Sequence, residues 1–213
     1  MTWMAAALPS SPAGRLVAAG AMRVPSKAIE LFLLRDFLEA DECAALRALV
    51  DARRRPSAIA DDQGAAGFRT SETCDLDDGE PIVAAVNARI ALLLDIDPAL
   101  GEPLQGQRYA PGQHFRPHTD TFEPGGHDYF LHCAVSGNRT WTAMIYLNVV
   151  EDGGATRFKA IAKTIRAEPG KLVAWNNLLP DGRPNPATLH EGMKVRLGTK
   201  YVLTKWYRER EGR

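Results

Sequence analysis

The pattern of hydrophobic and polar positions changes at about residue 104 of the chain. Before this point, apolar residues recur every three or four positions in two stretches, which is typical of helices that bury one face. After it, apolar and polar residues alternate in short runs separated by Pro-Gly, Gly-Gly and Asp-Gly pairs, which is typical of strands joined by turns. The chain is therefore predicted to begin with helices and to continue as a β-sheet structure.

The helical half is predicted to contain one buried strand and two helices. The strand is expected at residues 28–37, where apolar residues are dense. The first helix is expected at residues 40–54, with acidic residues in its first turn and arginines at its end, as the helix dipole prefers. The second is expected at residues 81–96, because Pro81 suits a first helical turn. The polar stretch between them, residues 57–80, is interpreted as exposed.

The second half is predicted to form eight short strands, and this number is typical of a double-sheet jelly roll. The strands are expected at residues 104–109, 115–120, 141–148, 155–158, 163–167, 172–176, 188–190 and 200–207. The two helices would brace one of the sheets. The predicted fold class is therefore α+β, with a double-stranded β-helix (jelly-roll) core braced by N-terminal helices.

Length and composition favour one domain. The chain has 213 residues, of which 45% are hydrophobic and 24% are charged, as in ordinary globular proteins. Residues 1–26, rich in Ala, Pro, Ser and Gly, are expected to be a loosely ordered N-terminal extension. Residues 27–213 are expected to form a single domain, with helical support at 27–100 and the jelly roll at about 102–208.

Charge and cysteine content indicate which classes of partner and which cellular compartment to expect. The 26 basic and 26 acidic residues give a net charge of zero, so electrostatics favour neither nucleic acid nor an anionic membrane. Three cysteines without C-x-x-C spacing argue against a disulfide framework and a zinc knuckle, and favour a reducing compartment. The first residues lack the basic start of a signal peptide, and no stretch reaches the roughly 20 apolar residues of a membrane helix. A cytoplasmic location is expected.

His118 and Asp120 are the first candidates for chemistry. They stand two residues apart in a predicted strand, so their side chains would share one face, roughly 6 to 7 Å apart along the strand. An imidazole and a carboxylate so placed, completed by a distant histidine, would form the facial set that holds Fe(II) and leaves other coordination positions open. The alternative interpretation is a solvated histidine beside a turn-forming aspartate.

The pattern alone leaves the third ligand open among the other histidines. His114 cannot easily share the face of His118 in an extended strand. His127 and His132 lie in a glycine-containing stretch that is interpreted as a loop, whereas His190 lies in a predicted strand.

The strand at residues 200–207 also presents a choice. Lys200, Val202, Thr204 and Trp206 share one face by alternation, and the residues between them share the other. If the first face points inward, a buried lysine would need an anion, and a dicarboxylate is such an anion. The alternative places Lys200 in water at the rim, and alternation does not decide between them.

Seven segments carry a resemblance to a known family. They are F-R-T-S at 68–71, R-Y-A-P-G-Q-H-F-R-P-H-T-D at 108–120, T-A-M-I-Y-L-N at 142–148, G-G-A-T-R-F at 153–158, P-G-K-L-V-A-W-N-N-L at 169–178, L-H-E-G at 189–192 and G-T-K-Y-V-L-T-K-W at 198–206. In this order they resemble the iron(II)- and 2-oxoglutarate-dependent dioxygenases, specifically the prolyl 4-hydroxylase-like branch.

The resemblance implies a set of cofactors and ligands. It implies Fe(2+) held by His118, Asp120 and His190, with 2-oxoglutarate as cosubstrate and L-ascorbate as an accessory. Lys200 matches the basic residue that binds the distal carboxylate of 2-oxoglutarate.

Three further residues are expected around these groups. Tyr109 matches a tyrosine that lines the cosubstrate pocket, and Trp206 is expected either as a pocket wall or as a core residue. Arg69 is expected to contact a substrate main chain or carboxylate. Residues 121–139, with three glycines and several aromatic residues, are interpreted as a lid over the substrate or as an ordinary long loop.

The implied activity is hydroxylation of a prolyl residue in a peptide or protein, with 2-oxoglutarate and O2 converted to succinate and CO2. Two alternatives stay open: a hydroxylase of a free amino acid or other small metabolite, and a catalytically silent jelly-roll binding module. The binding module would be expected to lack one of the ligands or the carboxylate-binding base, and all four positions are filled. A zinc hydrolase is disfavoured because the resemblance extends well beyond the ligands.

Overall fold

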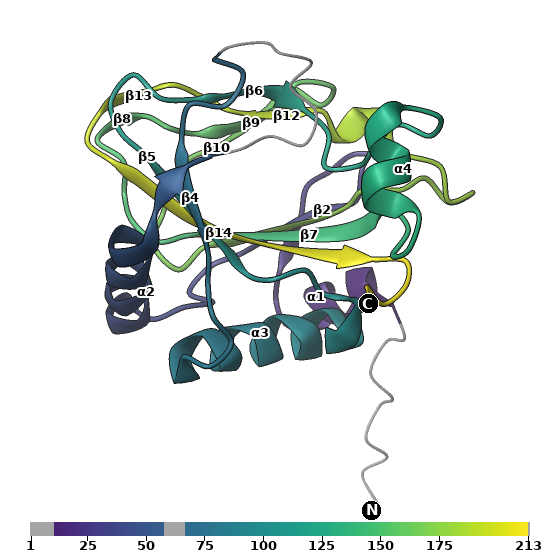
Figure 1. Cartoon of the computed structure of the whole chain (residues 1–213), viewed down its shortest axis with the longest axis horizontal. Coiled ribbons are helices and arrows are strands. Elements are labelled where there is room, and N and C mark those ends of the chain that lie inside the picture. The colour runs from purple at the N-terminus through teal and green to yellow at the C-terminus, as the bar shows by residue number, and fades with distance from the viewer. Residues whose placement is uncertain (1–10, 58–66, 213) are drawn as a thin grey trace, which may run out of the picture.

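The computed structural model describes residues 11–57 and 67–212 (Figure 1). The helical elements of these residues are α1 (Pro12–Ala18), α2 (Ala40–Arg53), α3 (Pro81–Leu94) and α4 (His127–Cys133), with 3-10 turns η1 (Pro98–Leu100) and η2 (Pro186–Thr188). Their strands are β1 (Met22–Arg23), β2 (Leu31–Leu34), β3 (Arg55–Pro56), β4 (Glu72–Asp75), β5 (Gln105–Tyr109), β6 (Phe115–His118), β7 (Arg139–Tyr146), β8 (Asp152–Gly153), β9 (Thr156–Phe158), β10 (Lys163–Ile165), β11 (Leu172–Asn176), β12 (His190–Gly192), β13 (Val195–Leu197) and β14 (Lys200–Arg208).

The strands form two facing antiparallel sheets. The major sheet has the order β1-β2-β11-β7-β14-β5-β4-β3, and the minor sheet has the order β10-β9-β12-β6; β13 and β8 form a separate pair. In Figure 1 the minor sheet lies above the major sheet. Residues from both sheets line a hollow between them. This arrangement confirms the predicted jelly roll braced by helices.

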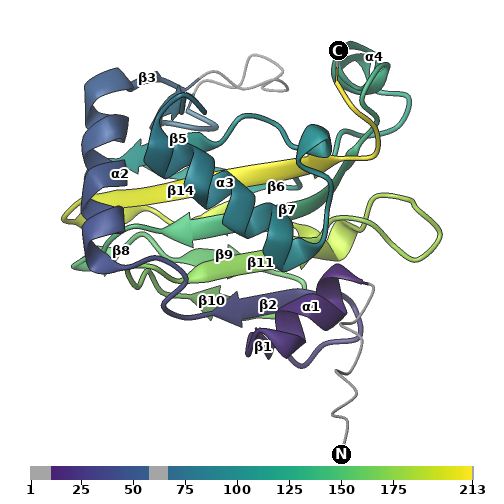
Figure 2. The same cartoon turned by 90° about the horizontal axis from the view of Figure 1, so that it is seen from below.

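The helices α1, α2 and α3 cover the outer face of the major sheet, as Figure 2 shows. The predicted helical stripes form this contact: Leu46 and Val50 of α2 and Val86 and Ile90 of α3 are fully buried in one core cluster. Helix α2 begins with a capping box between Glu39 and its third residue, which satisfies free N–H groups at the helix start. No helix in the described part of the chain is both long and apolar enough to cross a membrane.

The alternation of β14 divides its side chains between two environments. Leu203 and Tyr207 belong to the core beneath the helices, whereas Val202 belongs to the second core, between the sheets. Lys200 and Trp206 line the space between the sheets together with Val202. The sequence left open whether Lys200 points inward or lies in water at the rim. The structure shows that the face carrying Lys200 points inward.

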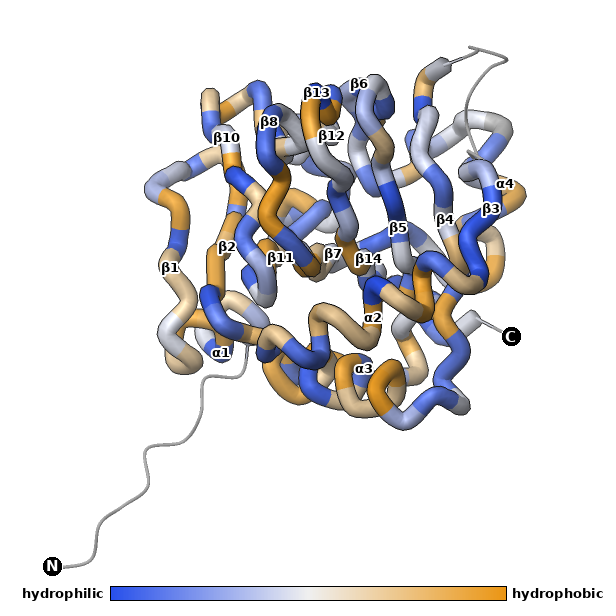
Figure 3. Tube along the Cα trace, turned by 90° about the vertical axis from the view of Figure 1, so that its left-hand side faces the viewer, coloured by the Kyte–Doolittle hydropathy of each residue, from blue (hydrophilic) through white to orange (hydrophobic). Residues whose placement is uncertain are grey.

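Hydropathy along the chain distinguishes the two sheets. In Figure 3, hydrophobic residues gather in α3 and in β2 and β11 of the major sheet, whereas β6 and β12 of the minor sheet are pale to blue. Strands β6 and β12 have the sequences FRPH and HEG, which offer little apolar surface to a core. Their polar side chains are therefore available for a site.

The N-terminal extension is more ordered than expected. Ser11 caps α1 by accepting a hydrogen bond from the backbone N–H of Gly14, and Leu16 of this helix is fully buried. Strand β1 then pairs with β2. The expectation of a loosely ordered start is therefore wrong for residues 11–23, whereas residues 1–10 lie outside the described part of the chain.

Several predicted elements differ in extent. The strand expected at residues 28–37 is limited to β2, and the supposedly exposed stretch 57–80 contributes β4, whose Cys74 is buried. The segment at residues 121–139 contains helix α4. The strand expected at residues 188–190 begins only at its last residue, because the chain first makes the turn η2.

Candidate active site

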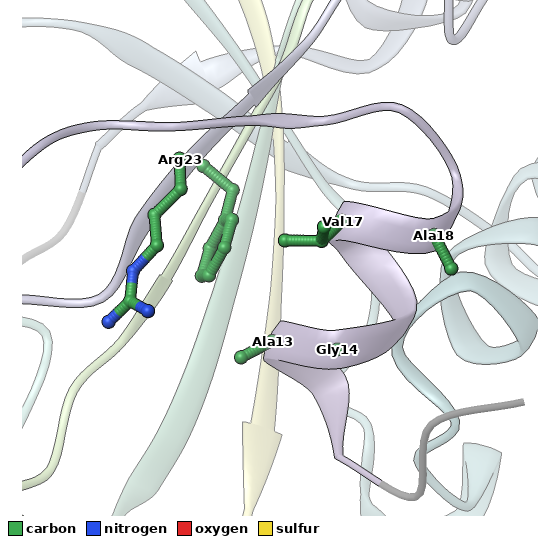
Figure 4. Close-up of a pocket in the computed structure, with 6 residues that line it drawn as sticks. Ala13, Gly14, Val17, Ala18 and Arg23 are labelled. Atoms are coloured by element: carbon green, nitrogen blue, oxygen red, sulfur yellow. The ribbon is translucent and has the colours of Figure 1, made fainter.

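Two hollows of the described structure differ in what lines them. The larger, with about 590 Å³ of empty space including its open mouth, is an apolar groove between α1 and the β1–β2 hairpin (Figure 4). The smaller, with about 380 Å³ on the same measure, lies between the two sheets. Only the second is lined by the predicted site residues His118, Asp120, His190 and Lys200.

The three predicted ligands converge in the second hollow. Strands β6 and β12 pair so that His118 and His190 stand directly opposite one another. Asp120 follows β6 by two residues, and its Oδ1 lies 4.0 Å from His118 Nε2. One donor atom from each of the three residues lies within 4.8 Å of the others. Strand pairing therefore brings together residues that are far apart in the sequence.

Hydrogen bonds turn both imidazoles toward this point. His118 Nδ1 lies 2.8 Å from the carbonyl oxygen of Arg116, and His190 Nδ1 lies 2.9 Å from that of Thr188. A carbonyl oxygen only accepts, so each Nδ1 carries the proton and each Nε2 keeps a free lone pair. Burial, followed by repulsion from His190, lowers the pKa of His118, so its imidazole is neutral and competent as a ligand.

The carboxylate of Asp120 is buried and ionised. Burial acts to raise its pKa, but the neighbouring histidines, Arg139 and a hydrogen bond from Thr142 more than offset this and lower the pKa. Two imidazole nitrogens and one carboxylate oxygen that converge on one point are the donor set of a facial Fe(II) site. The residues present therefore fit the metal that the resemblance implies.

Lys200 carries a buried amino group that has no counter-ion among the described residues. It is 1% exposed, and its Nζ lies over the rings of Tyr109 and Tyr146, 5.1 and 5.5 Å from their centroids. Burial alone lowers its pKa to about 7. Its Nζ approaches β12, because a β-carbon placed on Gly192 would lie 3.8 Å from it. The cavity thus holds a cation near the strand that carries His190.

Tyr109 and its neighbours form a polar wall on β5 and β14. Tyr109 stands opposite Lys200 in the strand register, and its hydroxyl donates to Gln107 Oε1 at 2.8 Å. Gln107 in turn donates to Thr204 Oγ1 at 3.1 Å. The structure therefore places Tyr109 beside the lysine, with its ring against the ammonium.

Trp206 lies in the cavity wall and is held by a charged network. The guanidinium of Arg139 lies 4.0 Å from the centre of its indole ring. Glu102 accepts hydrogen bonds from Arg139 at 2.6 and 2.7 Å and pairs with Arg208 at 2.5 Å. The indole N–H has no partner among the described residues. Trp206 is therefore a wall residue with a free donor.

Arg69 is half-buried beside Phe115, a residue of the cavity wall. It donates to Ser71 Oγ at 2.9 Å and to Gln105 Oε1 at 3.1 Å, and its guanidinium lies 4.9 Å from the ring centre of Phe115. Burial lowers its pKa. Since neither of these hydrogen-bond partners is a carboxylate, its charge is available to a ligand.

The segment at residues 121–139 has a fixed start. Asn138 accepts a hydrogen bond from the backbone N–H of Phe122 at 3.0 Å and donates to its carbonyl oxygen at 2.8 Å. The guanidinium groups of Arg139 and Arg208 each lie 5.3 Å from the ring centre of Phe122. Phe122 is therefore anchored, whereas Phe130 of α4 is 67% exposed. The lid interpretation can apply only to the residues after Phe122.

Sequence reasoning missed several residues of the site. Thr142 lies on the strand that the pattern predicted at residues 141–148, and alternation places it on one face with Met144 and Tyr146. Nothing in the pattern marked Arg139, which stands at a strand start, or Asn177, which follows a strand end.

Comparison with known proteins agrees with this site. Residues 104–208 match the family model of the 2OG-Fe(II) oxygenase superfamily. The rat prolyl 4-hydroxylase subunit alpha-3 is 35% identical over an alignment of 183 residues, which covers 83% of this chain and 33% of that protein. Prolyl 4-hydroxylase 1 of Arabidopsis thaliana is 31% identical over an alignment of 204 residues, which covers 84% of this chain and 69% of that protein.

A solved structure supports the same relationship. The crystal structure of a viral collagen prolyl hydroxylase from Paramecium bursaria chlorella virus 1, in complex with 2-oxoglutarate, aligns with a TM-score of 0.66 and 25% identity. The alignment covers 86% of this chain and 97% of that one. The chain therefore belongs to the 2OG-Fe(II) oxygenase superfamily. Within it, the chain is similar to prolyl 4-hydroxylases, although it spans only about a third of the length of the rat subunit.

Proposed function

We propose that the protein is an Fe(II)- and 2-oxoglutarate-dependent dioxygenase that hydroxylates a prolyl residue in a peptide or protein. The observation that carries this proposal is one cavity lined both by three converging ligand residues and by a buried lysine that has no anionic partner within residues 11–57 and 67–212. A silent binding module is disfavoured, because such a module has no need to keep an uncompensated buried ammonium. The names of the relatives support the prolyl substrate.

Each site residue has a proposed role. His118, Asp120 and His190 would hold the iron, and when bound this ion supplies the redox chemistry that couples 2-oxoglutarate decarboxylation to hydroxylation. Lys200 would pair with the distal carboxylate of 2-oxoglutarate and orient it toward the ligands. Tyr109 would line the same pocket. The apolar and aromatic walls would exclude water from the reacting groups.

A direct test offers the enzyme a choice of substrates. The iron-loaded protein is incubated with 2-oxoglutarate and either a proline-rich peptide or free L-proline, and the products are analysed by mass spectrometry. The proposal predicts that the peptide gains one oxygen atom only when 2-oxoglutarate is present. Hydroxylation of free proline without hydroxylation of the peptide would replace the proposal with the small-metabolite alternative.

Arg69 is proposed to bind the substrate, because its guanidinium lies against the cavity residue Phe115 and its hydrogen-bond partners in the described structure are neutral. Replacing it with alanine should raise the KM for a peptide about 10- to 100-fold, the usual effect of losing a hydrogen bond to a charged group. The affinity for 2-oxoglutarate should stay unchanged. Steady-state kinetics with each substrate varied in turn would test this, and an unaltered peptide KM would remove Arg69 from the substrate site.

The buried lysine predicts a pH-dependent affinity for 2-oxoglutarate. The pKa of Lys200 is lowered to about 7, so the ammonium is charged below this pH and neutral above it. The affinity for 2-oxoglutarate should therefore be greatest below pH 7 and should fall about tenfold for each pH unit above 7. Lys200→Arg should lose this slope, because a guanidinium stays protonated.

Calorimetric titration of the metal-loaded protein with 2-oxoglutarate across this pH range is the measurement. The ratio of the two affinities, wild type to Lys200→Arg, cancels the titration of other groups. A ratio that does not change with pH would show that Lys200 does not titrate in this range.

Two further features are proposed, an accessory reductant and a cellular compartment. Ascorbate is proposed as an accessory reductant from the resemblance alone, and its effect on turnover tests it. A reducing compartment such as the cytoplasm is proposed because Cys43, Cys74 and Cys133 are buried free thiols.

A further inference from the structure

A chain of two hydrogen bonds leads away from Asp120 into the protein. Thr142 Oγ1 donates to Asp120 Oδ2 at 2.6 Å, and Asn177 Nδ2 donates to Thr142 Oγ1 at 2.8 Å. Thr142 and Asn177 are 0% exposed, and Asp120 is 6% exposed. Bulk water cannot replace these bonds, so their direction depends on the groups themselves.

The chemistry of the three groups permits only one direction. An ionised carboxylate only accepts, so Thr142 must give its single hydroxyl proton to Asp120. The Thr142 oxygen then has only lone pairs left, and Asn177 must present its NH2 group to them. This orientation leaves Asn177 Oδ1 buried without a partner among the described residues. A buried unpartnered acceptor costs about 1–3 kcal/mol, so the fold keeps this orientation at a cost in stability.

The hydrogen-bond chain makes the two oxygens of Asp120 different. Thr142 occupies Oδ2, whereas Oδ1 faces the histidines, 4.0 Å from His118 Nε2. Oδ2 already shares a lone pair with the Thr142 hydroxyl, so Oδ1 is the oxygen better placed to bind a metal. A carboxylate that bound with both oxygens would fill one of the open positions that the cosubstrate and dioxygen need.

We propose that Thr142 and Asn177 are positioning residues that hold Asp120 as a one-oxygen metal ligand. Thr142 acts through its hydroxyl proton, and Asn177 acts through Thr142 by fixing where that proton points. The inference rests on the proposed function, because it concerns an iron ligand. A purely structural pair would stabilise the fold without setting the affinity for a metal.

The test measures metal affinity without turnover. The full-length protein, without 2-oxoglutarate, is titrated with Co(II), whose visible absorption reports binding. Thr142→Val keeps the shape but removes the hydroxyl, and should raise the Kd about 10- to 100-fold, as losses of such supporting groups do. Thr142→Ser restores the hydroxyl and should return the Kd close to that of the wild type.

Two more variants separate positioning from packing. Thr140→Val removes a hydroxyl from the same strand, but that hydroxyl donates to the carbonyl oxygen of Tyr207 at 3.2 Å, so the Kd should not change. Asn177→Asp keeps the size but replaces the donor with an acceptor that competes for the Thr142 proton, so it should weaken binding. Circular dichroism of each metal-free variant shows that it is folded at the temperature of the titration.

The outcomes are distinguishable. Equal affinity of wild type and Thr142→Val, or equally weak binding by Thr142→Ser and Thr142→Val, would overturn the inference while leaving the metal site intact. Failure of the folded wild-type protein to bind Co(II) would instead overturn the proposed function, and the inference with it.

Discussion

Replacing Asp120 with alanine is expected to abolish coupled turnover of 2-oxoglutarate. Asp120 is the only carboxylate of the ligand cluster found in the described residues, and its loss would leave a divalent cation on two neutral imidazoles. Metal-ion catalysis contributes several kcal/mol, so turnover should fall about 1000-fold or more. The measurement is succinate formation by the iron-supplemented enzyme with a saturating peptide.

Asp120→Asn is the matched variant, because it keeps the size of the side chain and removes its charge. It should lose most of the activity as well, since an amide is a poor ligand for Fe(II) and its NH2 group cannot accept the proton of Thr142. Circular dichroism of the metal-free proteins checks that both variants fold. Wild-type turnover in a folded Asp120→Ala protein would remove this residue from the metal site.

Replacing Lys200 with methionine is expected to have opposite effects on binding and on stability. Removing the ammonium that is proposed to pair with the distal carboxylate should weaken 2-oxoglutarate binding about 100- to 1000-fold. The metal-free protein should become about 1–4 kcal/mol more stable, because a buried ammonium without a counter-ion is replaced by an apolar side chain of similar length.

The gain in stability should depend on pH in a defined direction. The pKa of Lys200 in the folded protein, about 7, lies below its ordinary value of 10.5, so the folded state binds this proton less tightly than the unfolded state. The destabilisation is full below pH 7 and disappears as the pH rises toward 10.5. Denaturant unfolding of both metal-free proteins at several pH values tests this.

Lys200→Arg is the control for charge, since it keeps a cation in the cavity. It should retain part of the affinity for 2-oxoglutarate and should show no gain in stability. If Lys200→Met bound 2-oxoglutarate as tightly as the wild type, the distal carboxylate would have to be bound elsewhere.

The sequence predicts which residues of a strand share a face, because alternation within a single strand determines this. On β14, alternation correctly grouped Lys200 with Trp206, because each strand residue faces opposite to the next. The same rule cannot say which strands pair. The placement of His190 directly opposite His118 depends on contacts between distant segments, and only the resemblance singled it out beforehand.

Other features of the fold and the site could not be predicted from the sequence pattern, because they depend on tertiary contacts. Helix α1 is too short and too rich in small residues to form alone, and it depends on the burial of Leu16. Asn177 lies just beyond β11, where no period applies, and its link to Asp120 runs through Thr142. Periodicity predicts which residues of a helix or strand share a face. Predicting a hydrogen-bond chain between strands also requires the register in which the strands pair.

The most direct test of the iron and 2-oxoglutarate site is visible absorption under anaerobic conditions, which requires no knowledge of the substrate. Purified protein is titrated with Fe(II) and then with 2-oxoglutarate, and wild type is compared with Asp120→Ala and Lys200→Ala. The proposed site predicts a metal-to-ligand charge-transfer band when 2-oxoglutarate is added to the wild type, and a lost or weakened band in both variants. Absence of the band in folded, iron-loaded wild-type protein would contradict the dioxygenase function.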